Sequence, residues 1–207
     1  MVDGMRVTPL LAVGALVAAL VSGCTSDGRE ENAPASTSSP SATTGSTTGT
    51  DDAAVAVRTV ARKGSVTGRI GKGERKDVVK RVARVVDKWL AAAYVDGDYP
   101  RGAGSFDETT WPGFTDGAAR TAKTDKDLMS NADIADRIAG LVVKKREITV
   151  DVLAVHRTAR AATARLKLAF RTAGDLERKV SVTGRVFLTK KNGKWKVFGY
   201  DVAKARV

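Results

Sequence analysis

The chain has 207 residues, enough for one domain with appendages, and 35 Lys and Arg against 23 Asp and Glu give it a net charge of +12. One cysteine and one histidine exclude an internal disulfide framework and a zinc site built from several His and Cys ligands. The hydrolase and metalloprotease motifs Gly-x-Ser-x-Gly and His-Glu-x-x-His are also absent, so we expect no metal and no cofactor.

The first residues have the composition of a targeting segment. Arg6 supplies a positive start, and residues 7–20 form an apolar run. The run is shorter than the roughly 20 residues that a membrane-spanning helix needs. It ends in Val21-Ser22-Gly23-Cys24, where small residues lead directly into the cysteine.

Residues 5–24 therefore resemble the lipobox of bacterial lipoproteins. In that family the cysteine thiolate takes a diacylglyceryl group, and a peptidase cuts just before the cysteine. The resemblance implies a signal peptide over 1–23 and a lipid on Cys24 that holds the protein at the extracytoplasmic face of the cell membrane. Either Met1 or Met5 fits as the start of this segment.

Residues 24–54 have the composition of a tether. Of these 31 residues, 13 are Ser or Thr and none is large and apolar, which predicts a disordered segment. Five acidic residues against Arg29 give the tether a charge of −4, and the signal segment is neutral, so residues 55–207 carry +16. A cationic domain outside the membrane attracts anionic lipid, anionic wall polymer or an acidic envelope protein, whereas the compartment excludes nucleic acid. A basic surface that serves only solubility is the alternative.

Helical periodicity dominates the first half of the folded part. A short strand is expected at 65–70, and a helix runs from Val78 to Ala93 and stops before Asp96-Gly97. After a loop over 99–114, Thr115 is a suitable cap for a second helix that ends at 129, and a short third helix covers 132–139.

From residue 147 the period changes to two, which predicts strands at 147–155, 162–171, 180–189 and 195–203. Asn192-Gly193 suits a type I′ hairpin turn between the last two. The fold class is therefore α+β: over residues 55–207, N-terminal helices pack on a twisted, four-stranded antiparallel meander with a cone-like shape.

Three segments carry a resemblance to a known fold: 89–94 at the end of the first helix, 114–118 at the start of the second, and the hairpin 187–201. Over about 77–203 the chain is similar to the nuclear transport factor 2-like cone fold, which includes mammalian-cell-entry-associated and SnoaL-like proteins. Its members are isomerases, dehydratases, binding modules and assembly subunits, so the resemblance leaves the function open.

An isomerase or dehydratase of that fold needs a base and an oxyanion donor inside the cone. His156 or Asp201 would be the base and Tyr200 the donor, with Gly199 marking a bulge that turns this part of the strand inward. His156 at a strand end also fits a solvent-exposed turn. Asp151 is expected to face outward, either into water or paired with a basic residue on a neighbouring strand, and Trp89 and Tyr94 are expected in the core.

We favour a non-catalytic binding domain for an envelope partner, an anionic polymer or a small apolar ligand. Trp111 in the long loop is a candidate contact residue, although a loop tryptophan often only anchors its own loop. Outward-facing cations on the strands would form the anion-contact surface: Arg165, Lys167, Arg171 and Arg185. A structural subunit that forms a homodimer through the exposed sheet face is the third reading.

Overall fold

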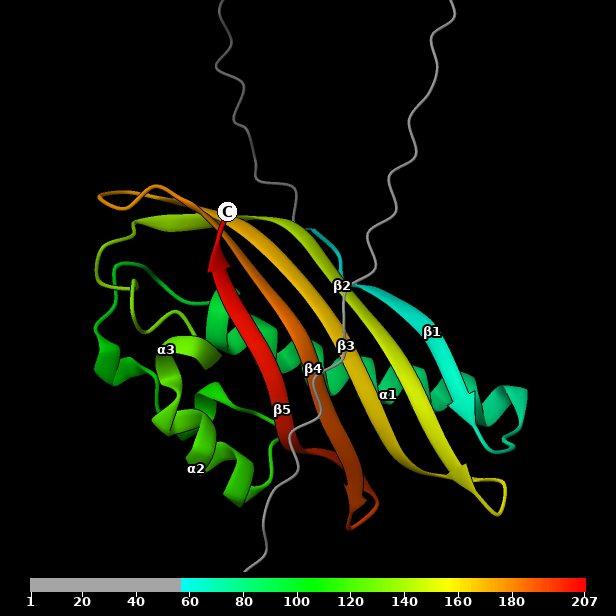
Figure 1. Cartoon of the computed structure of the whole chain (residues 1–207). Helices are drawn as coiled ribbons and strands as arrows, with labels where there is room; N and C mark the ends of the chain where they lie inside the picture. Colours follow the sequence, from blue (N-terminus) through cyan, green and yellow to red (C-terminus); the bar gives the residue numbers. More distant parts are fainter. Residues whose placement is uncertain (1–56) are drawn as a thin grey trace, which may run out of the picture. The chain divides into compact units, whose positions relative to one another are not determined.

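The computed structural model describes residues 57–207, so Cys24, the expected signal peptide and the expected tether lie outside it. A five-stranded sheet has the order β1-β2-β3-β4-β5 (Figure 1). Its strands are β1 (Val60–Thr67), β2 (Gly140–Val155), β3 (Thr158–Ala173), β4 (Lys179–Lys191) and β5 (Lys194–Arg206). The α-helices are α1 (Lys72–Leu90), α2 (Asp116–Thr124) and α3 (Lys126–Met129). A π turn (Ala91–Val95) and two 3-10 turns (Ala103–Ser105 and Glu108–Thr110) follow α1.

The expectation of N-terminal helices on a four-stranded antiparallel meander is wrong. The described chain begins with a strand, β1, which pairs parallel with β2 and makes the sheet mixed. The expected strand at 65–70 overlaps only the end of β1. Most side chains of β1 are exposed, so it lacks the alternation that reveals a half-buried strand.

The other four strands do form, and the pairs β2–β3, β3–β4 and β4–β5 are antiparallel. The residues expected to face inward on them are buried: Ile148, Val150, Val152, Ala164, Leu166, Leu168, Phe170, Val182, Val186 and Leu188. All four strands extend beyond their expected bounds. Period-two alternation thus placed the meander correctly but could not show that it was part of a larger sheet.

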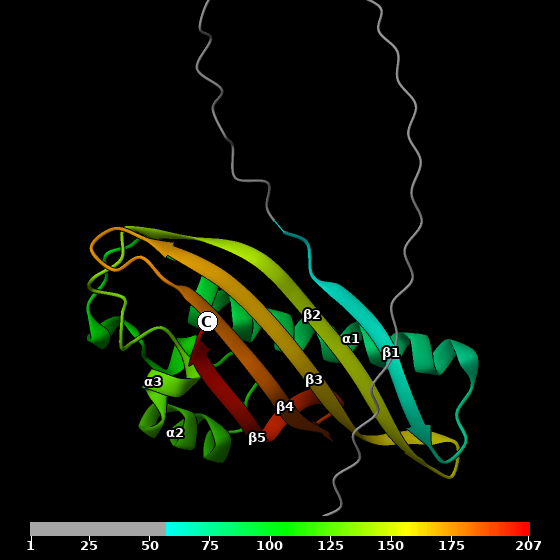
Figure 2. The same ribbon diagram turned by 45° about the horizontal axis from the view of Figure 1, so that its top comes forward.

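The connection from β1 to β2 contains all the helices. α1 crosses one face of the sheet, and α2 and α3 lie beside β5 (Figure 2). α1 confirms the helix expected over 78–93, although it begins earlier, at Lys72. It ends at Leu90, so the last residues of the expected helix lie in the π turn. None of the helices within residues 57–207 has the length and apolar character needed to cross a bilayer.

The second expected helix is present as two pieces, and the third is absent. Thr115 caps α2 by accepting a hydrogen bond from the Ala118 amide at 3.3 Å, as expected. Residues 132–136 form turns instead of a helix, because the Ile134 and Ala135 amides both bond to the Asn131 carbonyl and the chain enters β2 soon afterwards. One turn of backbone bonding is too short to propagate a helix.

Aromatic side chains fill the space between α1 and the sheet. Trp89 and Tyr94 are fully buried and Phe170 is 1% exposed, so the expected core placement of the first two is confirmed. The Trp89 ring contacts the rings of Tyr94 and Phe114 edge-on, with centroid distances of 5.9 and 5.5 Å. Interlocking of this kind leaves the helix-covered face of the sheet packed rather than hollow.

Two backbone features shape β5. Asn192 and Gly193 have φ of 52° and 74°, which confirms the I′-type turn expected before this strand. The register with β4 then shifts where Phe187 pairs with Gly199 and Leu188 with Val197. This bulge reverses the side-chain alternation of β5, as expected, and turns Tyr200 toward the helices.

Candidate functional site

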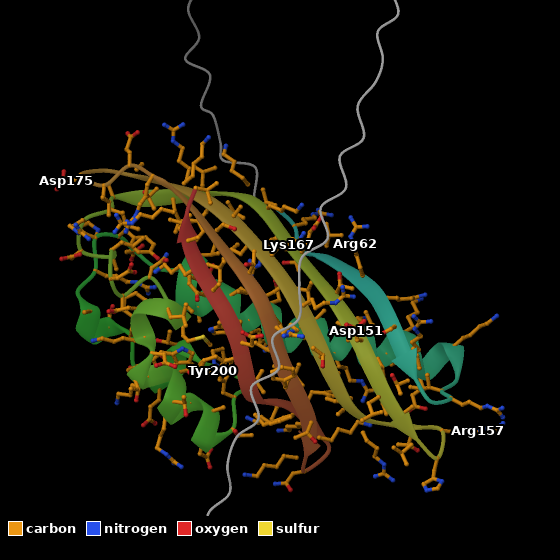
Figure 3. The ribbon with its side chains drawn as sticks, viewed as in Figure 1. Arg62, Asp151, Arg157, Lys167, Asp175 and Tyr200 are labelled. Carbon is orange, nitrogen blue, oxygen red and sulfur yellow. The ribbon has the colours of Figure 1, made fainter. Side chains whose placement is uncertain are left out.

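The three residues expected in an enzymatic site lie apart. His156 is exposed in the turn between β2 and β3 and has φ of 49°. The Tyr200 hydroxyl donates to Asp125 Oδ2 at 2.7 Å, beside α2 and α3 (Figure 3). Asp201 points to the other face of the sheet, where its Oδ2 lies 2.8 Å from Arg185. The base and oxyanion donor expected for the isomerase or dehydratase alternative are therefore not brought together by these three residues.

Tyr200 has a structural environment. Burial raises the pKa of its hydroxyl, and the hydrogen bond to Asp125 raises it further, so the phenol stays protonated and remains a donor. This bond ties β5 to the junction of α2 and α3. The hollows described below are not lined by Tyr200, His156 or Asp201.

Trp111 does not offer a contact surface. Its side chain is 2% exposed and belongs to the hydrophobic core. It therefore anchors the loop between α1 and α2, the second of the two roles that its sequence position allowed.

Three of the four cations expected to form an anion-contact surface are paired with carboxylates. Arg165 lies 2.9 Å from Asp151, Arg171 lies 3.5 Å from Glu177, and Arg185 lies 2.8 Å from Asp201. Lys167 forms no ion pair among the described residues. Figure 3 shows Asp151 and Lys167 on the face of the sheet turned away from α1. We call this the outer face, and its positive charge is largely compensated.

Asp151 is the best-connected carboxylate of the outer face. Its Oδ1 accepts from the Ser65 amide at 2.6 Å and from the Ser65 hydroxyl at 2.9 Å, and Arg165 donates to both of its oxygens. Partial burial disfavours the charged form, but the hydrogen bonds from Ser65 and Arg165 outweigh it and lower the pKa of Asp151. The expected pairing of Asp151 with a basic neighbour is confirmed, and it also fastens the irregular part of β1 to β2.

Uncompensated cations gather elsewhere, around a surface hollow of about 540 Å³ that we call the basic groove. One wall comes from α1 and the other from β5. Five cations line it and no carboxylate does: Arg81, Arg84, Lys88, Lys194 and Lys196. Within residues 57–207, none of these five forms an ion pair.

Local sequence explains both walls. Arg81, Arg84 and Lys88 are spaced by three and four residues, which places them on one side of a helix. Lys194 and Lys196 are two residues apart, which places them on one side of a strand. The Asn-Gly turn fixes where that strand begins.

The floor of the basic groove is apolar and closely packed. It consists of Val85, Pro112, Gly113 and Trp195. Gly113 has φ of 84°, and a Cβ on it would lie 2.7 Å from a Val85 methyl group, so the loop approaches α1 as closely as glycine allows. The Val197 amide donates to the Gly113 carbonyl at 2.9 Å, which holds the same loop against β5.

A second hollow of about 400 Å³ adjoins the basic groove and shares Lys194 and Lys196 with it. Lys191, Asn192, Phe114, Thr115 and the single carboxylate of Asp116 complete its lining. The two hollows together form a positively charged track along the start of β5. Such a track concentrates anions, because closely spaced like charges beside a low-dielectric floor raise the local potential.

The sequence contains a partial signal for these cations. The spacing of Arg81, Arg84 and Lys88 identifies a common side of the helix. Only the packing of Gly113 between α1 and β5 shows that this side and the start of β5, with Lys194 and Lys196, line the same hollow.

Among residues 57–207, no group of three or more His, Cys, Asp or Glu side chains lies close enough to hold a metal ion. The chain matches no protein-family model, no curated protein and no solved structure. The resemblances to lipoproteins and to the nuclear transport factor 2-like fold therefore stay predictions, and the site has to be interpreted from its own chemistry.

Proposed function

We propose that this protein is a lipid-anchored, extracytoplasmic binding protein whose folded domain captures an anionic component of the cell envelope without catalysis. The observation that carries the proposal is the basic groove, where five cations that form no ion pair within residues 57–207 surround an apolar floor. The +16 charge of the domain acts in the same direction at longer range.

The packing of the core supports binding rather than catalysis. Trp89, Tyr94 and Phe170 occupy the space that a substrate of a cone-fold enzyme would need. The basic groove itself contains no carboxylate and no histidine to act as a general base.

The anchor is supported by the lipobox-like residues that end at Cys24, and it has a direct test. The whole chain is expressed in a bacterial host with labelled palmitate, beside a Cys24→Ala variant. We expect label in the protein and its recovery with membranes, and we expect the variant to lose the label. An unlabelled protein, or a variant that fractionates in the same way, would refute the anchor.

The binding role is tested with the mature, lipidated chain in neutral detergent. We expect it to bind an anionic wall polymer and to ignore an uncharged polysaccharide. The affinity should fall steeply between about 50 and 300 mM salt, because added ions screen exposed charges. Binding that is indifferent to salt, or equal for the uncharged polymer, would contradict the proposal.

A further inference from the structure

We propose that the basic groove is a subsite for a phosphate-bearing wall polymer, and that it holds more than one anionic repeat between α1 and β5. This inference rests on the proposed function and deepens it by naming the site and the ligand chemistry.

The two walls suit phosphodiesters. Arg81 and Arg84 carry planar guanidinium groups that can donate two parallel hydrogen bonds to one phosphate, and the lysines act as point charges. Val85 and Pro112, which are both half-buried, offer apolar surface between the walls to the carbon backbone that links the phosphates. A ligand of alternating charged and apolar units therefore fits better than a compact, fully hydrated anion.

The track is longer than one anion needs. The basic groove continues into the second hollow through the shared Lys194 and Lys196, and Lys191 extends the positive charge to the hairpin tip. A lone phosphate would contact only a fraction of these cations. A polymer that presents a phosphate in every repeat would contact cations in both hollows at once. Its overall affinity would rise, because once one phosphate is bound the next is held close to the second hollow.

The track lies far from the point where the anchoring segment joins the fold. β1 and β5 are the two edges of the sheet, four strand spacings or about 19 Å apart. Val60 at the start of β1 aligns through the pairings with Ala203, whereas Thr67 at its end aligns with Lys196. The start of β1 thus lies seven residues, or about 23 Å, further along the strands than the groove.

This separation leaves the start of β1 clear of an occupant of the groove. The length of the track, with cations in both hollows and apolar surface between them, favours an extended polymer over a single lipid headgroup. We therefore assign the groove to a polymer and not to the membrane.

The test compares two charge-reversal variants of the mature, lipidated chain in neutral detergent. Arg84→Glu with Lys194→Glu reverses one cation on each wall of the basic groove. Lys144→Glu with Lys167→Glu makes the same charge change at exposed positions on β2 and β3. We expect the groove variant to lose at least about tenfold in affinity for poly(glycerol phosphate), and the control to lose less than about threefold.

Three probes separate the sources of phosphate. Besides the polymer, free glycerol 3-phosphate is titrated at equal phosphate concentration. Binding to phosphatidylglycerol vesicles is compared with binding to phosphatidylcholine vesicles, because the lipid anchor inserts into both kinds of vesicle and only the headgroup charge differs. We expect the polymer to bind at least about tenfold more tightly per phosphate than the monomer, because only the polymer engages several cations. We also expect vesicle binding to be the same for the groove variant and the control.

Each other outcome overturns the assignment. Equal losses of polymer affinity in the two variants would show diffuse electrostatic attraction. An unchanged polymer affinity of the groove variant would show that the polymer binds at another site. In both cases the proposed function would still stand. Equal affinity for monomer and polymer would make the groove a small-phosphate site. A groove-dependent preference for phosphatidylglycerol would assign it to the bilayer. If the wild-type chain bound no anion at all, the proposed function would fail with the inference. Circular dichroism, and a milder Arg84→Gln/Lys194→Gln pair, guard against misfolding as the cause of a loss.

Discussion

The outer face of the sheet and the basic groove carry similar numbers of cations but use them differently. On the outer face, Arg165, Arg171 and Arg185 each have a carboxylate partner. In the basic groove, Arg84, Lys194 and their neighbours have none among the described residues. The cations of the outer face are therefore neutralised by carboxylates of the same domain, whereas the cations of the groove remain available to bind an anionic ligand.

This difference shows why a count of basic residues is a poor guide to a binding surface. An exposed ion pair contributes only about 0–1 kcal/mol to stability, yet it removes most of the local potential. Clustered cations without partners repel one another, which costs stability and raises the potential. The four predictions that follow perturb one region or the other.

The largest effect is expected at the floor of the groove. Gly113→Ala places a Cβ on a residue with φ of 84° and against the Val85 side chain. The left-handed conformation costs a non-glycine residue about 1–2 kcal/mol, and the crowding adds about 1–2 kcal/mol more. Urea unfolding should therefore show a loss of about 2–4 kcal/mol. Gly102→Ala is the control, since its φ is −69° and its Cβ would meet nothing within 4 Å. Similar losses in both variants would mean that the loop does not depend on this close approach.

A smaller effect is expected from the outer face. Asp151→Asn removes a charge that accepts hydrogen bonds from Ser65 and Arg165, and should cost about 1–2 kcal/mol in the free energy of unfolding. Asp175→Asn changes an exposed carboxylate that forms no ion pair within residues 57–207, and should change stability by less than about 0.5 kcal/mol. Equal stability of the Asp151→Asn variant and the wild type would show that the carboxylate contributes nothing to holding β1.

The effect of Asp151→Asn should also depend on pH. The pKa of Asp151 is lower in the folded chain than the value of about 3.9 expected when unfolded. Its stabilising contribution is therefore complete above the unfolded pKa and is lost as the pH falls from there through the lowered folded pKa. The stability gap between wild type and variant should stay constant from about pH 7 to pH 5 and close in stronger acid. A gap that closes by pH 5, or that widens in acid, would assign the effect to another group.

The smallest effect has opposite signs in the two regions. Arg84→Gln relieves repulsion with Arg81 and Lys88 and should raise the free energy of unfolding by up to about 0.5 kcal/mol at low salt. Arg165→Gln breaks the pair with Asp151 and should lower it by up to about 1 kcal/mol. Both differences should shrink in high salt because the charges are exposed. Changes of the same sign would remove the distinction between paired and unpaired regions.

Sequence reasoning succeeded where one face of an element is buried. The alternation in β2–β5 and the helical spacing from Val78 onward follow the side chains that are buried. Asn192-Gly193 determines its turn through the backbone preference of these two residues. The sequence of β1 shows no such pattern, because most of its side chains are exposed. Its parallel partner, β2, also lies far along the chain, beyond all the helices.

The site was less predictable than the fold, for a related reason. The sequence correctly predicts that Arg165, Arg171 and Arg185 face outward. The alternation does not reveal that each has a carboxylate partner on a neighbouring strand or loop. Whether a cation is compensated depends on contacts between distant segments. The facing of Arg84 and Lys194 likewise depends on how the loop at Gly113 packs between them.

The parallel edge strand has a mechanical consequence. Tension applied to the chain ahead of Val60 pulls along β1 and loads its evenly spaced hydrogen bonds to β2 together, in shear. The Asp151 contacts to Ser65 resist the same displacement, and Thr59 adds a bond to Asp87 on α1. A terminal helix would instead unwind turn by turn under such a pull. We expect the domain to keep its shape under a pull applied at Val60, because the load is carried across the sheet.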